Sequence, residues 1–329
     1  MRVAFVGKGG SGKTTMAALF ARYTARHGGP VVAIDADINQ HLGMVLGMGE
    51  EELPRPLGAH LTEIKDYLRG DNPRIVSAAA MVKTTPPGRG SRLLRLGGDD
   101  AIHAGFATPA PQGGGPRLMV TGPFADDDLG VACYHSKVGA VELYLNHLVD
   151  GAGEYAVVDM TAGADSFASG LFTRFDVTFL MAEPTLQGVG VYRQYRDHAA
   201  RYGVKVAVIG NKVHGPDDVA FLRERVGADL LAWMGHSAAV RAMEQGRPLT
   251  LADLEAPVLG VLAGMLAYVD GRAEDRDWAR FGRQAGEFHL RNARAWANRA
   301  VGEDLAAQID PGFVYGPEAL AAGPPARRP

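Results

Sequence analysis

The sequence predicts an α/β fold built on a doubly wound, mainly parallel sheet of about seven strands flanked by helices. Short β-branched runs recur over residues 1–268, most of them ending in Gly, Asp or Asn, and stretches of helical periodicity separate them. Strands that alternate with helices imply right-handed crossovers and therefore a parallel sheet. The predicted strands are 2–6, 31–34, 118–121, 155–158, 177–181, 205–209 and 230–233.

Composition narrows the class of protein. The 329 residues are 47% hydrophobic and 22% charged, which is ordinary for a globular chain, and the net charge of -3 supplies no general attraction for nucleic acid or anionic lipid. We therefore expect no sequence-specific nucleic-acid binding. The longest uncharged apolar stretch, 256–269, is too short to cross a membrane, and the single cysteine cannot form an internal disulfide. A cytoplasmic location is expected.

Composition also suggests how the chain is divided. One α/β domain is expected over 1–268, interrupted by a mobile insertion at about 84–117 that holds 8 Gly and 5 Pro. Helical periodicity returns within 269–303, which predicts a C-terminal helical extension. The Gly-, Pro- and Ala-rich remainder, 304–329, is expected to be a loosely structured tail.

The first predicted strand runs into GKGGSGKTT at 7–15 and then into a predicted helix, the context that a phosphate-binding loop (P-loop) requires. Consecutive glycines let main-chain N–H groups point at phosphate oxygens, and the helix N-terminus adds partial positive charge. Lys13 is placed to reach the β and γ phosphates of ATP, and Thr14 to hold Mg²⁺. The expected nucleotide-binding residues of this loop are Gly9, Gly10, Ser11, Gly12, Lys13, Thr14 and Thr15.

Carboxylates follow two of the predicted strands. Asp35 and Asp37 follow the second strand, and Asp159 ends the strand at 155–158 and opens the sequence DMTAG. Carboxylates at the carboxyl edge of a parallel sheet can orient Mg²⁺ or the attacking water in phosphoryl transfer. For Asp35 and Asp37, capping of a helix N-terminus is the alternative interpretation.

A second lysine, Lys8, narrows the class further. KGGSGKTT at 8–15 resembles the deviant Walker A loop of the MinD, ParA, nitrogenase iron protein and arsenite-pump ATPases. The resemblance implies an ATP-dependent homodimer in which Lys8 crosses to the partner's nucleotide, and it makes Lys8, Lys13 and Asp37 the expected catalytic residues. For Lys8 taken alone, a solvated charge on the loop is the alternative interpretation. The resemblance also places Asp35 and Asp159 near the Mg²⁺, directly or through water, with Asp159 to Gly163 as switch II.

The same resemblance assigns residues to the nucleotide base. Glu183 and Pro184 follow the fifth predicted strand, and Asn211 and Lys212 follow the sixth, where the family binds the adenine edge. A turn or a helix cap is the alternative for either pair. Relatives carry a Pro-x-Asp turn over the base, but this chain has Gly235 and Ser237 in place of the Pro and the Asp.

Residues 130–135, GVACYH, resemble the CooC-type ATPases of carbon monoxide dehydrogenase maturation, which carry a C-x-C pair here. This chain keeps Cys133 but has Val131 at the first cysteine. A Cys133 thiolate and His135 from each protomer would provide four ligands for Ni²⁺ or Zn²⁺ at the dimer interface. The alternative is a buried, packing cysteine. One cysteine per chain does not supply a four-iron cluster, so a redox role is set aside.

In the C-terminal extension, Trp278, Phe281, Ala285, Phe288 and Trp296 fall near one helix face. Arginines beside that face allow contact with anionic lipid, but acidic residues dilute their charge, so docking on the core or on a partner is favoured over membrane contact.

The sequence thus predicts a Mg²⁺-dependent ATPase whose dimer switches conformation on hydrolysis and acts in maturation, including metal insertion, or regulation of a partner protein. One alternative is a MinD- or ParA-like positioning ATPase on membrane or nucleoid. The other is a nucleotide-gated binding module that does not hydrolyse ATP.

Overall fold

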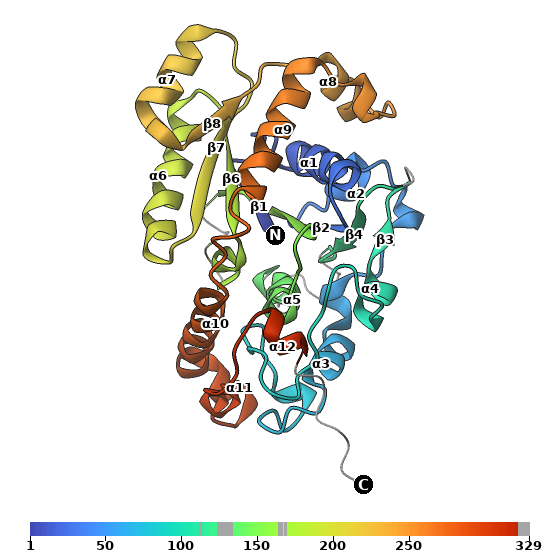
Figure 1. Ribbon diagram of the computed structural model, residues 1–329, viewed down its shortest axis with the longest axis vertical. Coiled ribbons are helices and arrows are strands. Elements are labelled where there is room, and N and C mark those ends of the chain that lie inside the picture. The colour runs from blue at the N-terminus through green and yellow to red at the C-terminus, as the bar shows by residue number, and fades with distance from the viewer. Residues whose placement is uncertain (112–113, 124–133, 164–166, 168–169, 322–329) are drawn as a thin grey trace.

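The computed structural model describes residues 1–111, 114–123, 134–163, 167 and 170–321. Within them the chain forms one eight-stranded sheet with the order β3-β4-β2-β5-β1-β6-β7-β8 (Figure 1). All seven predicted strands are present. The strands are β1 (Arg2–Gly7), β2 (Val31–Ala36), β3 (Thr108–Pro109), β4 (Arg117–Val120), β5 (Tyr155–Met160), β6 (Val177–Ala182), β7 (Lys205–Gly210) and β8 (Leu230–Trp233).

Strand β1 lies at the centre of the sheet, between β5 and β6, and pairs parallel with both. The only antiparallel pair among the described strands is β3 with β4, at the edge. Loops that leave β1 and its neighbours at their carboxyl ends therefore meet at one place, which is where ligands bind in doubly wound sheets.

Helices cover both faces of the sheet. Alternate residues of β1 point to opposite faces, so Val3 and Phe5 enter one core while Ala4 and Val6 enter the other. The first core includes a cluster of Phe5, Phe20 and Phe179, whose ring centroids are 5.5–5.7 Å apart. The helices of this domain are α1 (Lys13–His27), α2 (Leu42–Val45), α3 (Leu61–Arg69), α4 (Ala101–Phe106), α5 (Tyr134–His147), α6 (Leu186–Arg201), α7 (Pro216–Val226), α8 (Ala238–Glu244) and α9 (Ala256–Asp270).

The segment 84–117 differs from the expected mobile insertion, because most of it packs on the domain. It contains α4 and β3, and the Leu94 main chain bridges to α5 through a 2.9 Å hydrogen bond from Leu94 N–H to His147. The His103 ring joins the Tyr144 hydroxyl at 2.8 Å. Gly90 and Gly97 lie in turns between anchored residues, which composition alone does not reveal.

The C-terminal extension comprises α10 (Trp278–Asn292), a π-helical turn (Ala293–Ala297), α11 (Asn298–Val301) and α12 (Pro317–Ala321). These elements lie together at the end of the molecule remote from α8 (Figure 1). Phe281 and Ala285 are buried, which confirms that this helix face docks on the core, whereas Trp296 stays 44% exposed. No helix in the described part of the chain has the length and apolarity to span a membrane.

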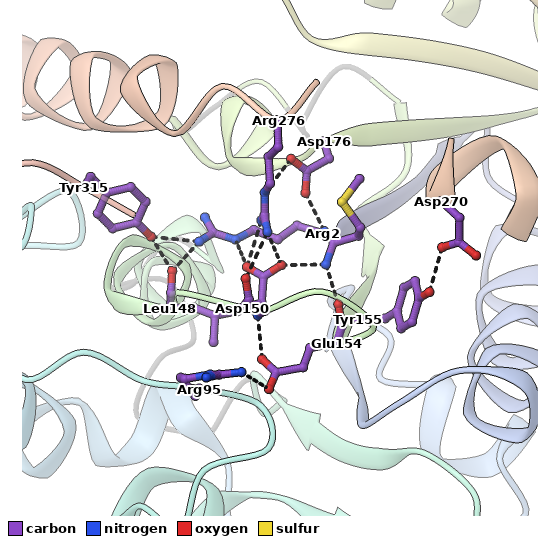
Figure 2. Close-up of polar contacts among 12 residues, drawn as sticks. Arg2, Arg95, Leu148, Asp150, Glu154, Tyr155, Asp176, Asp270, Arg276 and Tyr315 are labelled. Carbon is purple, nitrogen blue, oxygen red and sulfur yellow. Dashed lines mark hydrogen bonds and ion pairs between the residues drawn. The ribbon is translucent and has the colours of Figure 1, made fainter. Parts of the chain in front are cut away.

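A buried polar cluster joins this extension to the core (Figure 2). Asp150 accepts hydrogen bonds of 2.8 Å from both Arg2 and Arg276, and it pairs at 2.6 Å with the α-amino group of Met1. Burial alone would raise the pKa of Asp150, but these cations hold it well below its ordinary value. The cluster is therefore an ionised network.

The expected loose tail also packs, through residue 321. Tyr315 accepts a 2.8 Å hydrogen bond from Arg2 and donates to the carbonyl of Leu148 (Figure 2). Asp310 pairs with Arg89 at 2.8 Å, and this contact lowers the pKa of Asp310 to about 2. The contacts of Tyr315 and Asp310 thus fix a segment whose composition resembles that of a linker.

Candidate functional site

The P-loop connects β1 to α1 at the carboxyl edge of the sheet. Gly10 and Gly12 have φ angles of 79° and 89°, in the left-handed region that favours glycine. A Cβ on Gly12 would lie 2.4 Å from the Asn211 amide, whereas a Cβ on Gly9 or Gly10 would meet no atom within 4 Å. The loop is thus packed at Gly12 and open at Gly9 and Gly10, where its main chain is accessible to a ligand.

Lys13 reaches the carboxylates of two strands. Its ammonium donates a hydrogen bond to Asp37 and lies 3.7 Å from Asp159 Oδ1. Burial lowers the pKa of Lys13, but Asp159 and Asp37 outweigh it, so the net shift is upward. The lysine is therefore a charged group beside the open P-loop, as binding of phosphate requires.

Thr14 and Asp159 form the second contact of the site. The Thr14 hydroxyl donates to Asp159 Oδ2 at 2.6 Å, while buried Asp159 Oδ1 accepts no hydrogen bond from the described residues. Burial raises the pKa of Asp159 to about 6, against the opposing effects of Lys13 and Thr14. A carboxylate oxygen without a hydrogen-bond donor beside a hydroxyl fits a Mg²⁺ ion, which prefers hard oxygen ligands.

Both carboxylate oxygens of Asp35 accept hydrogen bonds from main-chain N–H groups. Its Oδ2 accepts a 2.8 Å hydrogen bond from the N–H of Leu42, the first residue of α2, and its Oδ1 accepts one from Asp37 at 3.1 Å. Burial, with the nearby Asp159 charge, raises the pKa of Asp35 to about 8. Both oxygens thus stabilise the turn that carries Asp37, as the capping alternative anticipates.

Two of the residues expected at the nucleotide base, Asn211 and Lys212, contact the P-loop. Asn211 donates from Nδ2 to the Ser11 carbonyl at 2.8 Å. Lys212 donates to the Gly10 carbonyl at 2.7 Å and to Glu183 at 2.6 Å. Pro184 follows, half-buried, before α6. In this structure these side chains brace the outer side of the P-loop.

Ser237 replaces the expected aspartate at the base loop, and it is used as a helix cap. Its hydroxyl oxygen accepts from Val240 N–H at 3.0 Å and its hydroxyl donates to Glu255 at 2.6 Å. Glu255 also accepts from the first N–H of α8, on Ala238, at 2.9 Å. A carboxylate 18 positions farther along the chain therefore supports the start of α8.

Two residues that contact the site, Gln40 and Glu244, were not predicted from the sequence. The Gln40 side chain donates to the Asp37 carbonyl at 2.6 Å and accepts from Gly122 N–H at 3.0 Å, which links the turn after β2 to the end of β4. Glu244 of α8 accepts from the Thr15 hydroxyl at 3.2 Å. Neither residue has a local sequence signal, because each reaches the site through tertiary packing.

The last two predicted features of the site are the second P-loop lysine, Lys8, and the metal site at Cys133. The half-buried side chain of Lys8 forms no hydrogen bond or ion pair with any residue the structure describes. Val131 and Cys133 lie outside the described residues, and His135 lies in the first turn of α5. Within the described ranges, no three His, Cys, Asp or Glu residues cluster as metal ligands.

The sequence matches the family model for the CobQ/CobB/MinD/ParA nucleotide binding domain over residues 3–249. The chain belongs to this family. It is 27% identical over 248 residues to the carbon monoxide dehydrogenase accessory protein CooC of Rhodospirillum rubrum, an alignment covering 74% of this chain and 87% of CooC. An ATP-binding protein of Methanocaldococcus jannaschii is 26% identical over 76% of this chain and 91% of its own length.

Solved structures of the family share the fold. The ParA family ATPase of Chlorobium tepidum matches with a TM-score of 0.54 and 14% identity, over 80% of this chain and 97% of its own. MinD of Aquifex aeolicus matches with a TM-score of 0.53 and 18% identity, over 84% and 97%. The predicted family and fold are thus confirmed, including the P-loop at the centre of the sheet.

Proposed function

We propose that the protein binds ATP with Mg²⁺, hydrolyses it as a homodimer and uses the cycle to switch its action on a partner protein. The convergence of Lys13, Asp37 and Asp159 carries this proposal, because one cation links the P-loop to both strands that hold carboxylates. Family membership supports nucleotide binding.

The chemistry follows from the site residues. Lys13 would exchange its contact with Asp37 for phosphate oxygens, and the released Asp37 carboxylate would orient the attacking water. Thr14 and Asp159 would hold Mg²⁺, which neutralises phosphate charge when bound. Asp37 thus acts both as the resting counterion of Lys13 and as the switch that responds to phosphate.

Dimerisation is proposed from Lys8. Its side chain has no partner among the described residues, although it lies in the P-loop beside the open main chain of Gly9. A cation held there without an ion pair is suited to an anion brought by a second subunit, as the resemblance to deviant Walker A ATPases implies.

The partner is proposed from the CooC relative, whose name describes an accessory protein of carbon monoxide dehydrogenase. An accessory role in enzyme maturation is the corresponding proposal for this chain. Cys133 is proposed to bind Ni²⁺ or Zn²⁺ between protomers. Metal content of the ATP-bound dimer, compared between wild type and Cys133→Ser, tests this part separately: one ion per dimer that is lost in the variant supports it, and no metal in wild type overturns it.

Steady-state phosphate release tests the ATPase proposal. Lys8→Ala should lose about a hundredfold in turnover, as removal of a preorganised charge does, while monomeric ATP binding stays within about twofold. Lys205→Ala is the matched control, because Lys205 is exposed at the start of β7. Unchanged turnover in Lys8→Ala would overturn the dimer model, and wild-type release at background level would favour a non-hydrolytic binding module.

A second assay separates the proposal from a positioning ATPase. Co-sedimentation with liposomes or with DNA, each with ATP and Mg²⁺, should leave the protein in the supernatant. ATP-dependent pelleting with either would replace the maturation proposal by a MinD- or ParA-like one.

A further inference from the structure

A cavity of about 70 Å³ lies between the α/β domain and the C-terminal extension, at the sheet edge opposite the P-loop. Asn146 and Arg174 line it from the domain, and Phe281, Ala285 and Ile309 line it from the extension. On α10 three small residues, Gly282, Ala285 and Gly286, line the cavity beside Phe281 and leave space there. The volume is several times that needed by one ordered water.

Arg174 is the charged group of this cavity, and it is 1% exposed. Its Nη1 donates to the Phe281 carbonyl at 3.1 Å, but Nε and Nη2 donate to no residue that the structure describes. These two nitrogens form one edge of the guanidinium, whose parallel N–H groups match the two oxygens of a carboxylate. A buried cation with this edge unused is costly without an acceptor.

Asn146 supplies a second polar atom. Its Nδ2 faces the carbonyls of Lys83 and Thr85, each at 3.5 Å, and its buried Oδ1 receives no hydrogen bond from the described residues. The cavity therefore combines two unused donors with one unused acceptor beside aromatic and aliphatic surface.

Two arginines, Arg2 and Arg280, and one buried carboxylate, Glu142, lie close enough to Arg174 to shift its pKa. Arg280 lies nearby, and its side-chain acceptors among the described residues are main-chain carbonyls, including Gly203 at 2.8 Å and Phe175 at 3.0 Å. Arg2 and Arg276 share Asp150 with the α-amino group, so that carboxylate is already engaged (Figure 2). Burial lowers the pKa of Arg174 to about 10, and the Glu142 carboxylate opposes this shift.

We propose that this cavity binds a small carboxylate-type monoanion, with its two oxygens on Nε and Nη2 of Arg174 and its apolar part against Phe281 and Ala285. Such a ligand would bridge the domain and its extension, because Arg174 belongs to the domain and already contacts α10. The proposal is independent of ATP hydrolysis, since none of the P-loop residues lines this cavity.

The test is thermal unfolding of the full chain in sodium acetate and in sodium formate, each compared with sodium chloride at equal ionic strength. Either carboxylate should raise Tm saturably, by about 2 °C at roughly tenfold above its Kd. Equilibrium dialysis with labelled acetate should give one ion per chain.

Two variants localise the effect. Arg174→Gln removes the cationic edge, and Ala285→Leu fills the cavity while it keeps Arg174, so each should abolish the Tm shift. Ala295→Leu, at an exposed position of the same extension, should retain it. If Arg174→Gln does not fold, Ala285→Leu alone decides the location.

A wild-type Tm that changes no more in the carboxylates than in chloride would overturn the proposal and mean that the cavity holds only water. A shift that is undiminished in Ala285→Leu would also overturn it, because the anion would then bind elsewhere.

Discussion

The ammonium of Lys212 lies 2.6 Å from the carboxylate of Glu183, so the loops after β6 and β7 are joined beside the P-loop. The same ammonium donates to the Gly10 carbonyl, at the point where the loop turns through a positive φ. The glycines give the P-loop main chain conformational freedom, and the ion pair between Lys212 and Glu183 restricts that freedom through the contact with Gly10.

Removal of the Lys212 contact should loosen the P-loop. Lys212→Met keeps much of the side-chain bulk but loses the hydrogen bonds to Gly10 and Glu183. Since a hydrogen bond to a charged group contributes about 1.5 kcal/mol, ATP binding should weaken by roughly three- to tenfold. Titration with a fluorescent ATP analogue measures this, with Lys205→Met as control. An unchanged Kd would show that the Lys212 contacts do not affect ATP binding.

Thr14→Val should separate the metal requirement from folding. Valine has nearly the same shape but lacks the hydroxyl that donates to Asp159. Turnover should fall by about a hundredfold and the Mg²⁺ concentration for half-maximal rate should rise, because the proposed metal ligand is lost. The control is Thr24→Val on the same helix, whose buried hydroxyl has no hydrogen-bond partner among the described residues. A normal Mg²⁺ dependence in Thr14→Val would argue against this hydroxyl as a ligand.

Stability should depend on pH through His147. This side chain is fully buried, donates from Nδ1 to the Leu143 carbonyl at 2.9 Å, and has its pKa lowered to about 4 by burial. Between that value and the ordinary 6.5 the unfolded chain binds more protons than the native state, so the free energy of unfolding falls as pH falls through this window. The loss should reach about 3 kcal/mol near pH 4.

Urea unfolding at a series of pH values checks this prediction. His147→Met should show a correspondingly smaller pH dependence, whereas His27→Met, at an exposed position, should behave as wild type. Equal slopes in wild type and His147→Met would contradict the assignment. Buried His289, whose pKa is also lowered by burial, contributes equally to all three proteins.

Tyr315→Phe should weaken attachment of the C-terminal segment. The variant loses the hydroxyl that accepts from Arg2 and donates to Leu148, and buried partners left unpaired cost about 1–2 kcal/mol. Urea unfolding should show that loss. Tyr23→Phe, whose ring stacks on His27, should stay within about 0.5 kcal/mol of wild type. Equal stabilities of wild type and Tyr315→Phe would mean that the hydroxyl is dispensable.

The parts of the fold that the sequence predicted are those encoded locally. Strand β1, the P-loop glycines and Lys13 are contiguous in the sequence, so the sequence pattern alone located the P-loop. The pattern also located the strand ends that carry Asp37 and Asp159. The roles of Asn211 and Lys212 were not predictable in the same way. Both lie where the pattern placed them, but their contacts with Ser11 and Gly10 span 200 and 202 positions.

Composition gave the wrong expectation for segments whose structure depends on a few specific side-chain and main-chain contacts. Glycine and proline content suggested a mobile insertion at 84–117 and a loose tail, yet Leu94, His103, Asp310 and Tyr315 fix these segments through contacts that no compositional average contains. The two-residue strand β3 was missed for the same reason, because it exists only through its pairing with β4.

The contact between Arg2 and Tyr315 also has a consequence for synthesis. The two residues are 313 positions apart, so the first strand leaves the ribosome long before its hydroxyl partner is translated. Domains generally fold as units during translation, and here the central strand is completed only by a late segment. Release of nearly the whole chain is therefore needed before this end of the sheet reaches its native packing, and a nascent chain stalled before residue 315 would carry an incompletely covered Arg2.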